Sequence, residues 1–284
     1  SPSGSVAGAG GVPALPRVSY RAEGHAFTVV LRPGPGSSVP VVEYLLTVTP
    51  RDVMPQPGGG YTECAVAGAG AVETSCVLYA QRGDWDVYVA AANDAGSSEW
   101  VGRSTWTVTS GPCTDEVAAA GACDLLDTGP GGGIIFYDAG TPQSWGRYLE
   151  AAPKGWFGRA DDPLYQWCDE YQPGYDGLAT KVTVGSGKDN TELIIANCGT
   201  NSAAGAAAAY RGGGKDDWFL PSKDELAKLY DKRSEAGMSG VFFWSSSQGE
   251  YSAVNAWGQF FDDGHQFNDG KDDAVGSVRP VRAF

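Results

Sequence analysis

The sequence predicts two domains, an all-β sandwich followed by an α+β domain. Over residues 13–110, short runs of β-branched and aromatic residues are separated by turns rich in glycine and proline, and no helical period interrupts them. Over residues 124–284, similar runs are mixed with segments of helical pattern. A chain of 284 residues has room for two domains of ordinary size.

The composition is that of an acidic protein from an oxidising compartment. The 34 acidic and 20 basic residues give a net charge of −14, which disfavours nucleic acid and anionic membranes as partners. Six cysteines without Cys-x-x-Cys spacing, beside only two histidines, predict disulfides rather than a zinc site. No apolar run reaches the length of a membrane span, so we expect a soluble extracellular protein that does not insert into a membrane.

The N-terminal domain follows a segment rich in Gly, Ala and Ser, residues 1–12, which we expect to be disordered. Strands are predicted over residues 26–31, 41–49, 75–80 and 85–93, because these runs are rich in β-branched and aromatic residues. Strands of this length and spacing are typical of a small β-sandwich of about 100 residues.

Three stretches of this domain, PRVSY, VEYLLTVTP and WDVYVAAANDAGSS, resemble a fibronectin type III domain, which implies an immunoglobulin-like sandwich. Two positions depart from the family pattern: Val29 and Val30 stand where the core tryptophan is usual, and Trp85 stands where the corner tyrosine is expected. Bacterial members often carry a cross-strand disulfide, and the resemblance implies one between Cys64 and Cys76. The residues that match the pattern are Trp85, Val87, Val89, Ala91, Asn93, Gly96 and Ser98.

The remaining four cysteines are paired by proximity in the chain alone. Residues 111–123 are predicted to form a hinge between the domains, and a bond between Cys113 and Cys123 would close this segment on itself. Cys168 and Cys198 are then the last pair, and their bond would tie a long loop to the end of a helix.

Helices are predicted only in the middle of the second half. Residues 190–199 and the alanine-rich residues 202–210 are two of them, and Gly199 is a plausible stop for the first. Ser222 and Glu225 have the spacing of a capping box at the start of a third, amphipathic helix.

Three other features have structural interpretations. The glycines of residues 127–133 lack a phosphate-binding motif and are predicted to form tight turns. Residues 245–247 are three serines without a Gly-x-Ser-x-Gly context, and only His265 could act as their base, so we expect them to hydrogen-bond a turn rather than act as nucleophiles. Arg279 and Arg282 are predicted to be buried or partly buried ion-pair partners.

Four stretches of the second half, GGIIFYDAG, GRYLEAAP, DDWFLPSKDEL and WSSSQ…AWGQFF…VRPVRAF, resemble the C-terminal domain of bacterial collagen-like adhesins over residues 124–284. The resemblance implies a variant of the C-type lectin fold, related to the formylglycine-generating enzyme, and a ligand-binding role at a bacterial or virion surface. Some members are variable proteins of diversity-generating retroelements, in which adenine-directed mutagenesis rewrites codons near the C-terminus. Related adhesin heads trimerise, so a homotrimer is an open alternative.

The resemblance places the ligand site in residues 249–273, where fixed scaffold residues alternate with exposed, diversified ones. A period of two would turn the fixed residues inward and the diversified residues outward. The fixed set is Trp244, Trp257, Gln259, Phe261, Gly264 and Gln266. The diversified set is Gly249, Glu250, Tyr251, Ser252, Val254, Gly258, Phe260, Asp263, His265, Phe267, Asp269, Gly270, Asp272 and Asp273. The alternative is that Phe260 and Phe267 pack under a loop or in an oligomer contact.

Several functions are compatible with this reading. The leading hypothesis is a variable protein that binds a protein or cell-surface glycan, and the second is a fixed adhesin or glycan-binding module of the same fold. A formylglycine-generating-type oxidase would need two accessible thiols, whereas the six cysteines can all pair, so we expect no enzyme activity. Five carboxylates have the hard oxygens that Ca²⁺ prefers, but their spacing matches no known calcium loop, so we expect no cofactor or metal. These five are Asp262, Asp263, Asp269, Asp272 and Asp273.

Overall fold

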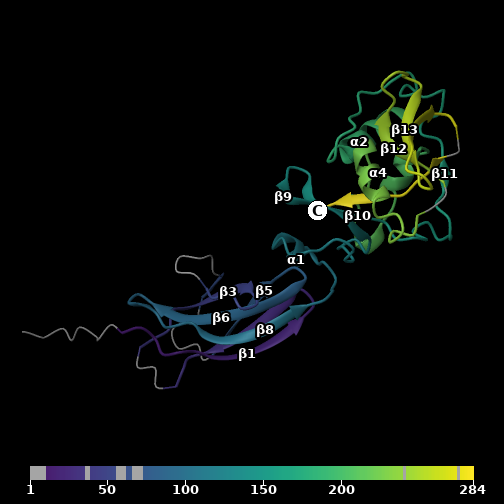
Figure 1. Ribbon diagram of the computed structural model, residues 1–284. Coiled ribbons are helices and arrows are strands. Elements are labelled where there is room, and N and C mark those ends of the chain that lie inside the picture. The colour runs from purple at the N-terminus through teal and green to yellow at the C-terminus, as the bar shows by residue number, and fades with distance from the viewer. Residues whose placement is uncertain (1–10, 36–38, 56–61, 66–72, 239–240, 274–275) are drawn as a thin grey trace, which may run out of the picture. The chain divides into compact units, whose positions relative to one another are not determined.

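The computed structural model describes residues 11–35, 39–55, 62–65, 73–238, 241–273 and 276–284, with only the backbone described at 62–65 and 101–103. The chain divides into two compact units (Figure 1). The N-terminal unit is Ser1–Gly111 with Ala119–Cys123, and the C-terminal unit is Pro112–Ala118 with Asp124–Phe284. Most of the segment predicted to be disordered, residues 1–10, lies outside the described residues.

The N-terminal unit is an antiparallel β-sandwich. One sheet has the strand order β1-β2-β5, and the other has the order β4-β3-β6-β7, with β8 also paired to β6. The strands are β1 (Arg17–Glu23), β2 (Ala26–Arg32), β3 (Glu43–Pro50), β4 (Thr62–Ala65), β5 (Thr74–Tyr79), β6 (Gly83–Asn93), β7 (Gly96–Ser97) and β8 (Val101–Val108).

The core of the sandwich follows the period of two in its strands. On β2, Phe27, Val29 and Leu31 are buried and alternate with more exposed residues, and Tyr44 and Leu46 do the same on β3 of the other sheet. These residues belong to one hydrophobic cluster. The two sheets therefore pack through their apolar faces, as aligned sandwiches do.

Two tryptophans explain the departures from the fibronectin type III pattern. Trp85 at the start of β6 donates from Nε1 to the Gln81 carbonyl at 2.8 Å, which is the backward hydrogen bond that a corner tyrosine makes with its hydroxyl. Trp106 on β8 is buried, with its ring 5.3 Å from that of Phe27. Trp106 thus supplies the core indole that β2 lacks.

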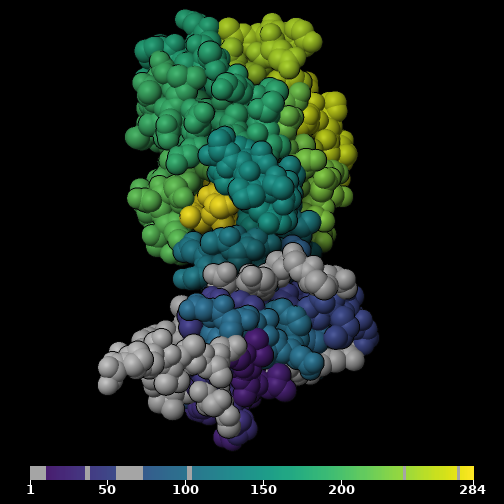
Figure 2. All heavy atoms as spheres, turned by 90° about the vertical axis from the view of Figure 1, so that its left-hand side faces the viewer, coloured from purple at the N-terminus to yellow at the C-terminus, as the bar shows by residue number. Residues whose placement is uncertain are grey.

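The C-terminal unit is α+β, with two sheets ordered β16-β10-β9 and β11-β15-β12-β13-β14. Figure 2 shows the yellow C-terminal residues beside the teal residues of the smaller sheet, in agreement with the pairing of β16 with β10. The strands are β9 (Ile134–Gln143), β10 (Gly146–Ala151), β11 (Leu164–Tyr165), β12 (Phe242–Gln248), β13 (Asn255–Phe260), β14 (Gln266–Gly270), β15 (Gly276–Ser277) and β16 (Val281–Ala283). The helices are α1 (Asp115–Ala119), α2 (Gly187–Cys198), α3 (Ala203–Ala208), η1 (Gly212–Gly214) and α4 (Lys223–Tyr230).

The predicted helices are present, with shifted ends. Helix α4 begins with the predicted capping box: the Ser222 hydroxyl accepts from the Glu225 amide, and the Glu225 carboxylate accepts from the Ser222 amide at 2.7 Å. Helix α2 begins three residues earlier than predicted and ends at Cys198, before Gly199. The segment predicted as a hinge contains α1, a short helix that the sequence analysis did not anticipate.

Strand β12 is buried on both faces. Phe242 and Trp244 belong to a hydrophobic cluster that includes residues of α2 and α3, whereas Phe243 between them belongs to a second cluster with Leu226 and Leu229 of α4. Strand β12 therefore lies at the centre of the unit, and its neighbours β13 and β14 lead outward to the edge of the larger sheet.

Candidate functional site

The predicted ligand site forms a hairpin at the edge of the larger sheet. Strands β13 and β14 pair antiparallel from Asn255–Gly270 to Gln259–Gln266, and β14 ends the sheet. In the turn, the Asp263 carboxylate accepts from the His265 amide at 2.8 Å. Gly264 has a φ of 82°, a left-handed conformation that favours glycine.

The predicted scaffold residues are buried or partly buried. Trp244 and Phe261 are 0% and 1% exposed, and Gln259 donates from Nε2 to the Gly264 carbonyl at 3.0 Å, which braces the turn. Gln266 is partly buried and donates to the Lys223 carbonyl at 3.2 Å. This face of the hairpin therefore lies toward the start of α4.

Trp257 is less buried than the period of two predicts. Its side chain is partly exposed, and the Lys223 ammonium lies 3.5 Å from the centroid of its ring. A cation over an indole is an attractive contact, strongest where water is excluded. The Trp257 side chain therefore lies at the margin of the contact with α4 and not in the core.

Most of the predicted diversified residues are exposed. Tyr251 is 91% exposed and Phe267 is 47% exposed, whereas Phe260 is 37% exposed and rests one edge on Phe242, with ring centroids 5.1 Å apart. Glu250, Val254, Asp263, His265 and Asp273 are also exposed, and Ser252, Asp269, Gly270 and Asp272 are partly exposed.

Two predicted diversified positions, Gly249 and Gly258, are buried instead of exposed. A Cβ atom on Gly258 would lie 2.2 Å from Cζ of Phe242, and one on Gly249 would lie 2.8 Å from Oδ1 of Asn268. The reason is that the Phe242 side chain of the neighbouring strand β12 lies over Gly258, so the outward face of β13 is covered there. These glycines are spacers that permit close packing.

Lys271 is the feature of this segment that sequence reasoning missed. It is 0% exposed, and its Nζ donates to the carbonyls of Gly174 and Tyr175 and to Oε1 of Gln248, at 3.0–3.1 Å. The Nζ also lies 4.7 Å from the centroid of the Trp167 ring. Burial lowers the pKa of Lys271 to about 8, against a weaker opposing effect of Asp176.

These contacts bring a second loop, residues 169–178, to the predicted site. The Tyr175 hydroxyl is 3.2 Å from Oδ1 of Asp272, and the backbone of Gly177 lies against Ala253. Burial first, and then the neighbouring Asp272, raise the pKa of Tyr175. No local pattern in the sequence indicates this approach, because the paired residues are about a hundred positions apart.

The disulfide at the base of this loop is confirmed. Cys168 and Cys198 are bonded, with Cα atoms 5.2 Å apart, and both are buried. Cys76, Cys113 and Cys123 are also disulfide-bonded, and no cysteine in the described part of the chain is free. The side chain of Cys64 lies outside the described residues, so its pairing with Cys76 stays a prediction, as does that of Cys113 with Cys123.

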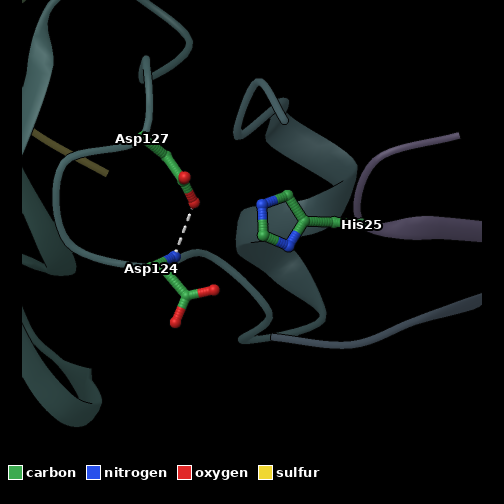
Figure 3. A group of neighbouring side chains, drawn as sticks. All are labelled: His25, Asp124 and Asp127. Atoms are coloured by element: carbon green, nitrogen blue, oxygen red, sulfur yellow. Dashed lines mark hydrogen bonds between the residues drawn. The ribbon is translucent and has the colours of Figure 1, made fainter. Parts of the chain in front are cut away.

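The glycine-rich loop binds a carboxylate of the protein itself. The loop follows a turn in which the Asp124 amide donates to Asp127 Oδ2 at 2.8 Å (Figure 3). Farther along, the amides of Gly131 and Gly133 donate to Glu150 at 2.9 and 3.0 Å. A Cβ on Gly131 would lie 2.7 Å from Glu150 Oε1, so the glycine permits this approach. The prediction of tight turns was therefore incomplete.

The two C-terminal arginines are ion-pair partners, as predicted. Arg282 donates to Glu150 at 3.0 Å and also pairs with Asp217. Arg279 makes two bonds to the carboxylate of Asp162, at 2.6 and 2.9 Å, and both side chains are more than nine-tenths buried. Such bidentate pairs fix geometry as well as charge.

The serine cluster lies in a strand rather than beside a turn, which corrects that expectation. Ser245, Ser246 and Ser247 are all 0% exposed within β12. The Ser245 hydroxyl donates to the Trp257 carbonyl and that of Ser247 to the Lys181 carbonyl, both at 2.8 Å. These hydroxyls therefore connect β12 to its neighbours.

Within the part of the chain that the structure describes, no three of the five carboxylates Asp262, Asp263, Asp269, Asp272 and Asp273 converge as metal ligands. Three of them instead accept backbone amides locally: Asp262 from Asp263 and Asp269 from Gly270, both at 2.9 Å, and Asp263 from His265 at 2.8 Å. Among the described residues, no helix has the length and apolarity needed to cross a bilayer.

The chain matches no family model and no curated protein. Solved structures similar to it include the fn3 domain of human collagen alpha-1(XX) chain, at 26% identity and a TM-score of 0.26, over 39% of this chain and 95% of that one. A fourth FNIII domain from human gives 18% identity and a TM-score of 0.25, over 39% and 93%. The twitchin kinase region from C. elegans gives 13% identity and a TM-score of 0.26, over 58% and 28%.

The strand order of the N-terminal unit is that of a fibronectin type III-like sandwich, with β1, β2 and β5 in one sheet and β3, β4, β6 and β8 in the other. Sandwiches of this kind and disulfides are both typical of extracellular proteins.

Proposed function

We propose that this chain is an extracellular ligand-binding protein in which the fibronectin type III-like unit carries a C-type-lectin-like unit. The exposed side chains of residues 249–273 form its ligand-binding face, and this face is diversified in the manner of a retroelement variable protein displayed on a bacterial or virion surface. The ligand is a protein or a cell-surface glycan.

The observation that carries the proposal is the division of burial within one hairpin. Gln259 and Phe261 are 4% and 1% exposed, whereas Phe260 between them is 37% exposed. On β14, Phe267 is 47% exposed beside the partly buried Gln266. A protein that varies its ligand contacts needs such a division, because side chains in solvent can change with small effects on stability while those in the core cannot.

The positions of the stretches that resemble the adhesin domain support a C-type-lectin-like scaffold. Glu150 of GRYLEAAP pairs with Arg282 of VRPVRAF, and both are buried. Ser222 and Glu225 of DDWFLPSKDEL start helix α4 with a capping box. The motif residues thus join distant segments within the unit, which is a structural role separate from the exposed face.

The test is the DNA sequence that flanks the gene. We expect a nearby template that differs from codons 249–273 only at adenines, with the differences concentrated in codons of exposed residues. Because Gly249 and Gly258 are buried spacers, their codons should match the template. If no such template exists, the diversification hypothesis is wrong and the alternative, a fixed adhesin or glycan-binding module, takes its place.

A further inference from the structure

The loop 169–178 adjoins residues 249–273, because the Tyr175 hydroxyl lies 3.2 Å from Oδ1 of Asp272, and both segments carry exposed aromatic rings. Tyr171 in this loop is 84% exposed, close to the 91% of Tyr251 and above the 47% of Phe267. Large exposed apolar groups beside polar ones are typical of interaction sites. We call these two segments together the aromatic–acidic face.

The two segments are held together as one structure. The buried ammonium of Lys271 binds the carbonyls of Gly174 and Tyr175 at 3.0 and 3.1 Å, and the Cys168 amide donates to the Lys271 carbonyl at 2.9 Å. The disulfide between Cys168 and Cys198 fixes the start of the loop. The loop is therefore positioned beside the hairpin before any ligand arrives, which reduces the ordering that binding would require.

The charge on this face has one sign. Three carboxylates lie in residues 169–178 and six lie in residues 249–273, whereas the two segments contain a single lysine and no arginine. That lysine, Lys271, is 0% exposed and all its hydrogen bonds go to the protein. The neighbouring Lys223 is engaged on the Trp257 ring. Exposed lysine and arginine side chains are thus missing from both described segments.

We propose that the ligand of this face is a protein segment rich in lysine and arginine, and that loop 169–178 is part of the contact. Lysine and arginine are the side chains that combine with both components of the face, because they form ion pairs with carboxylates and stack on aromatic rings. Polyanionic glycans would be repelled. This inference rests on the proposed ligand-binding function of residues 249–273 and adds both the loop and the chemistry of the partner.

The test uses the full chain and a random-peptide library displayed on phage, with an array of neutral glycans as a parallel probe. Bound peptides are sequenced and then measured against three variants. The loop variant is Asp169→Asn, Glu170→Gln and Asp176→Asn. The second variant, Glu250→Gln with Tyr251→Ala, changes two residues just before strand β13 and is called the hairpin variant. The control variant, Asp189→Asn, Glu192→Gln and Asp231→Asn, removes the same charges as the loop variant from exposed positions outside the face.

We expect enriched peptides to carry net positive charge and to bind the loop variant about tenfold more weakly, because three rim charges at several tenths of a kcal/mol each give this factor. The hairpin variant should bind them about fivefold more weakly, because it loses one rim charge and one ring that can stack on a cation. The control variant should change affinity by less than about twofold. Thermal unfolding of each variant establishes that the fold is intact.

The other outcomes separate the two proposals. If cationic peptides lose affinity only for the hairpin variant, the extension to loop 169–178 is wrong and the proposed function stands. If binding peptides are neutral or acidic, or if neutral glycans bind with the same dependence on the variants, the assignment of a cationic protein partner is wrong. If no probe depends on either segment, the proposed function itself fails.

Discussion

The carboxylates of the C-terminal unit lie in two contrasting environments. Glu150 and Asp162 are buried, and each is paired with an arginine and further hydrogen-bonded. Glu250 and Asp273, in the hairpin segment, are exposed. Removing a charge from water costs several kcal/mol unless geometry compensates it, so the buried carboxylates are tied to the fold, whereas the exposed ones are available for a ligand.

The largest expected effect is at the buried pairs. Arg282→Met leaves Glu150 and Asp217 without their cation, and breaking a buried pair in this way should cost about 3–5 kcal/mol of unfolding free energy. Urea unfolding measures the free energy of unfolding of this variant and of Glu250→Gln. The second substitution removes an exposed carboxylate and should change stability by less than about 0.5 kcal/mol. Equal costs for the two variants would remove the distinction between the regions.

The burial of Lys271 makes the stability of the chain depend on pH. The folded lysine has a pKa of about 8, below the ordinary lysine value of 10.5, so between these pH values the folded chain releases a proton that the unfolded chain keeps. Unfolding then takes up a proton, and stability rises with pH across this window, by an order of 1–3 kcal/mol.

The measurement is urea unfolding of the wild type and of Lys271→Met at several pH values between about 8 and 10. The difference in stability, wild type minus variant, should increase with pH, because the variant lacks the titrating group. A constant or decreasing difference would show that the ammonium is not desolvated as its contacts indicate.

A smaller effect distinguishes two glycines of the hairpin. Gly258→Ala places a Cβ 2.2 Å from the Phe242 ring and should cost about 1–3 kcal/mol by overpacking. Gly270→Ala meets only the flexible carboxylate ends of Asp272 and Asp273 and should cost less than about 0.5 kcal/mol. Thermal melts of both variants measure the difference, and a tolerated Gly258→Ala would return this position to the diversified set.

The smallest effect is expected for the exposed rings. The double variant Phe260→Ala and Phe267→Ala should unfold within about 1 kcal/mol of the wild type, because both side chains are exposed and the ring beside Phe267 is the exposed His265 rather than a core residue. A loss as large as that of Arg282→Met would mean that these rings pack, as the alternative interpretation holds, and that the face is not a free surface.

The capping box and the strand pattern could be predicted because their causes are local. Ser222 and Glu225 are three residues apart, and the alternation of Phe27, Val29 and Leu31 follows from the geometry of a single strand. The same rule failed at Gly258 and was incomplete at Trp257. A period of two separates the faces of a strand, but it does not say whether a neighbouring element covers the second face.

The sequence by itself determined the two-unit organisation, the helix start at Ser222 and the burial of Arg279 and Arg282. Only the tertiary structure decided that Glu150 occupies the glycine-rich loop, that Lys271 is buried and that loop 169–178 lies beside the hairpin. The physical reason is distance along the chain. Periodicity, caps and turns act over a few residues, whereas these contacts join residues up to about a hundred positions apart, where the packing of the whole unit sets the partners.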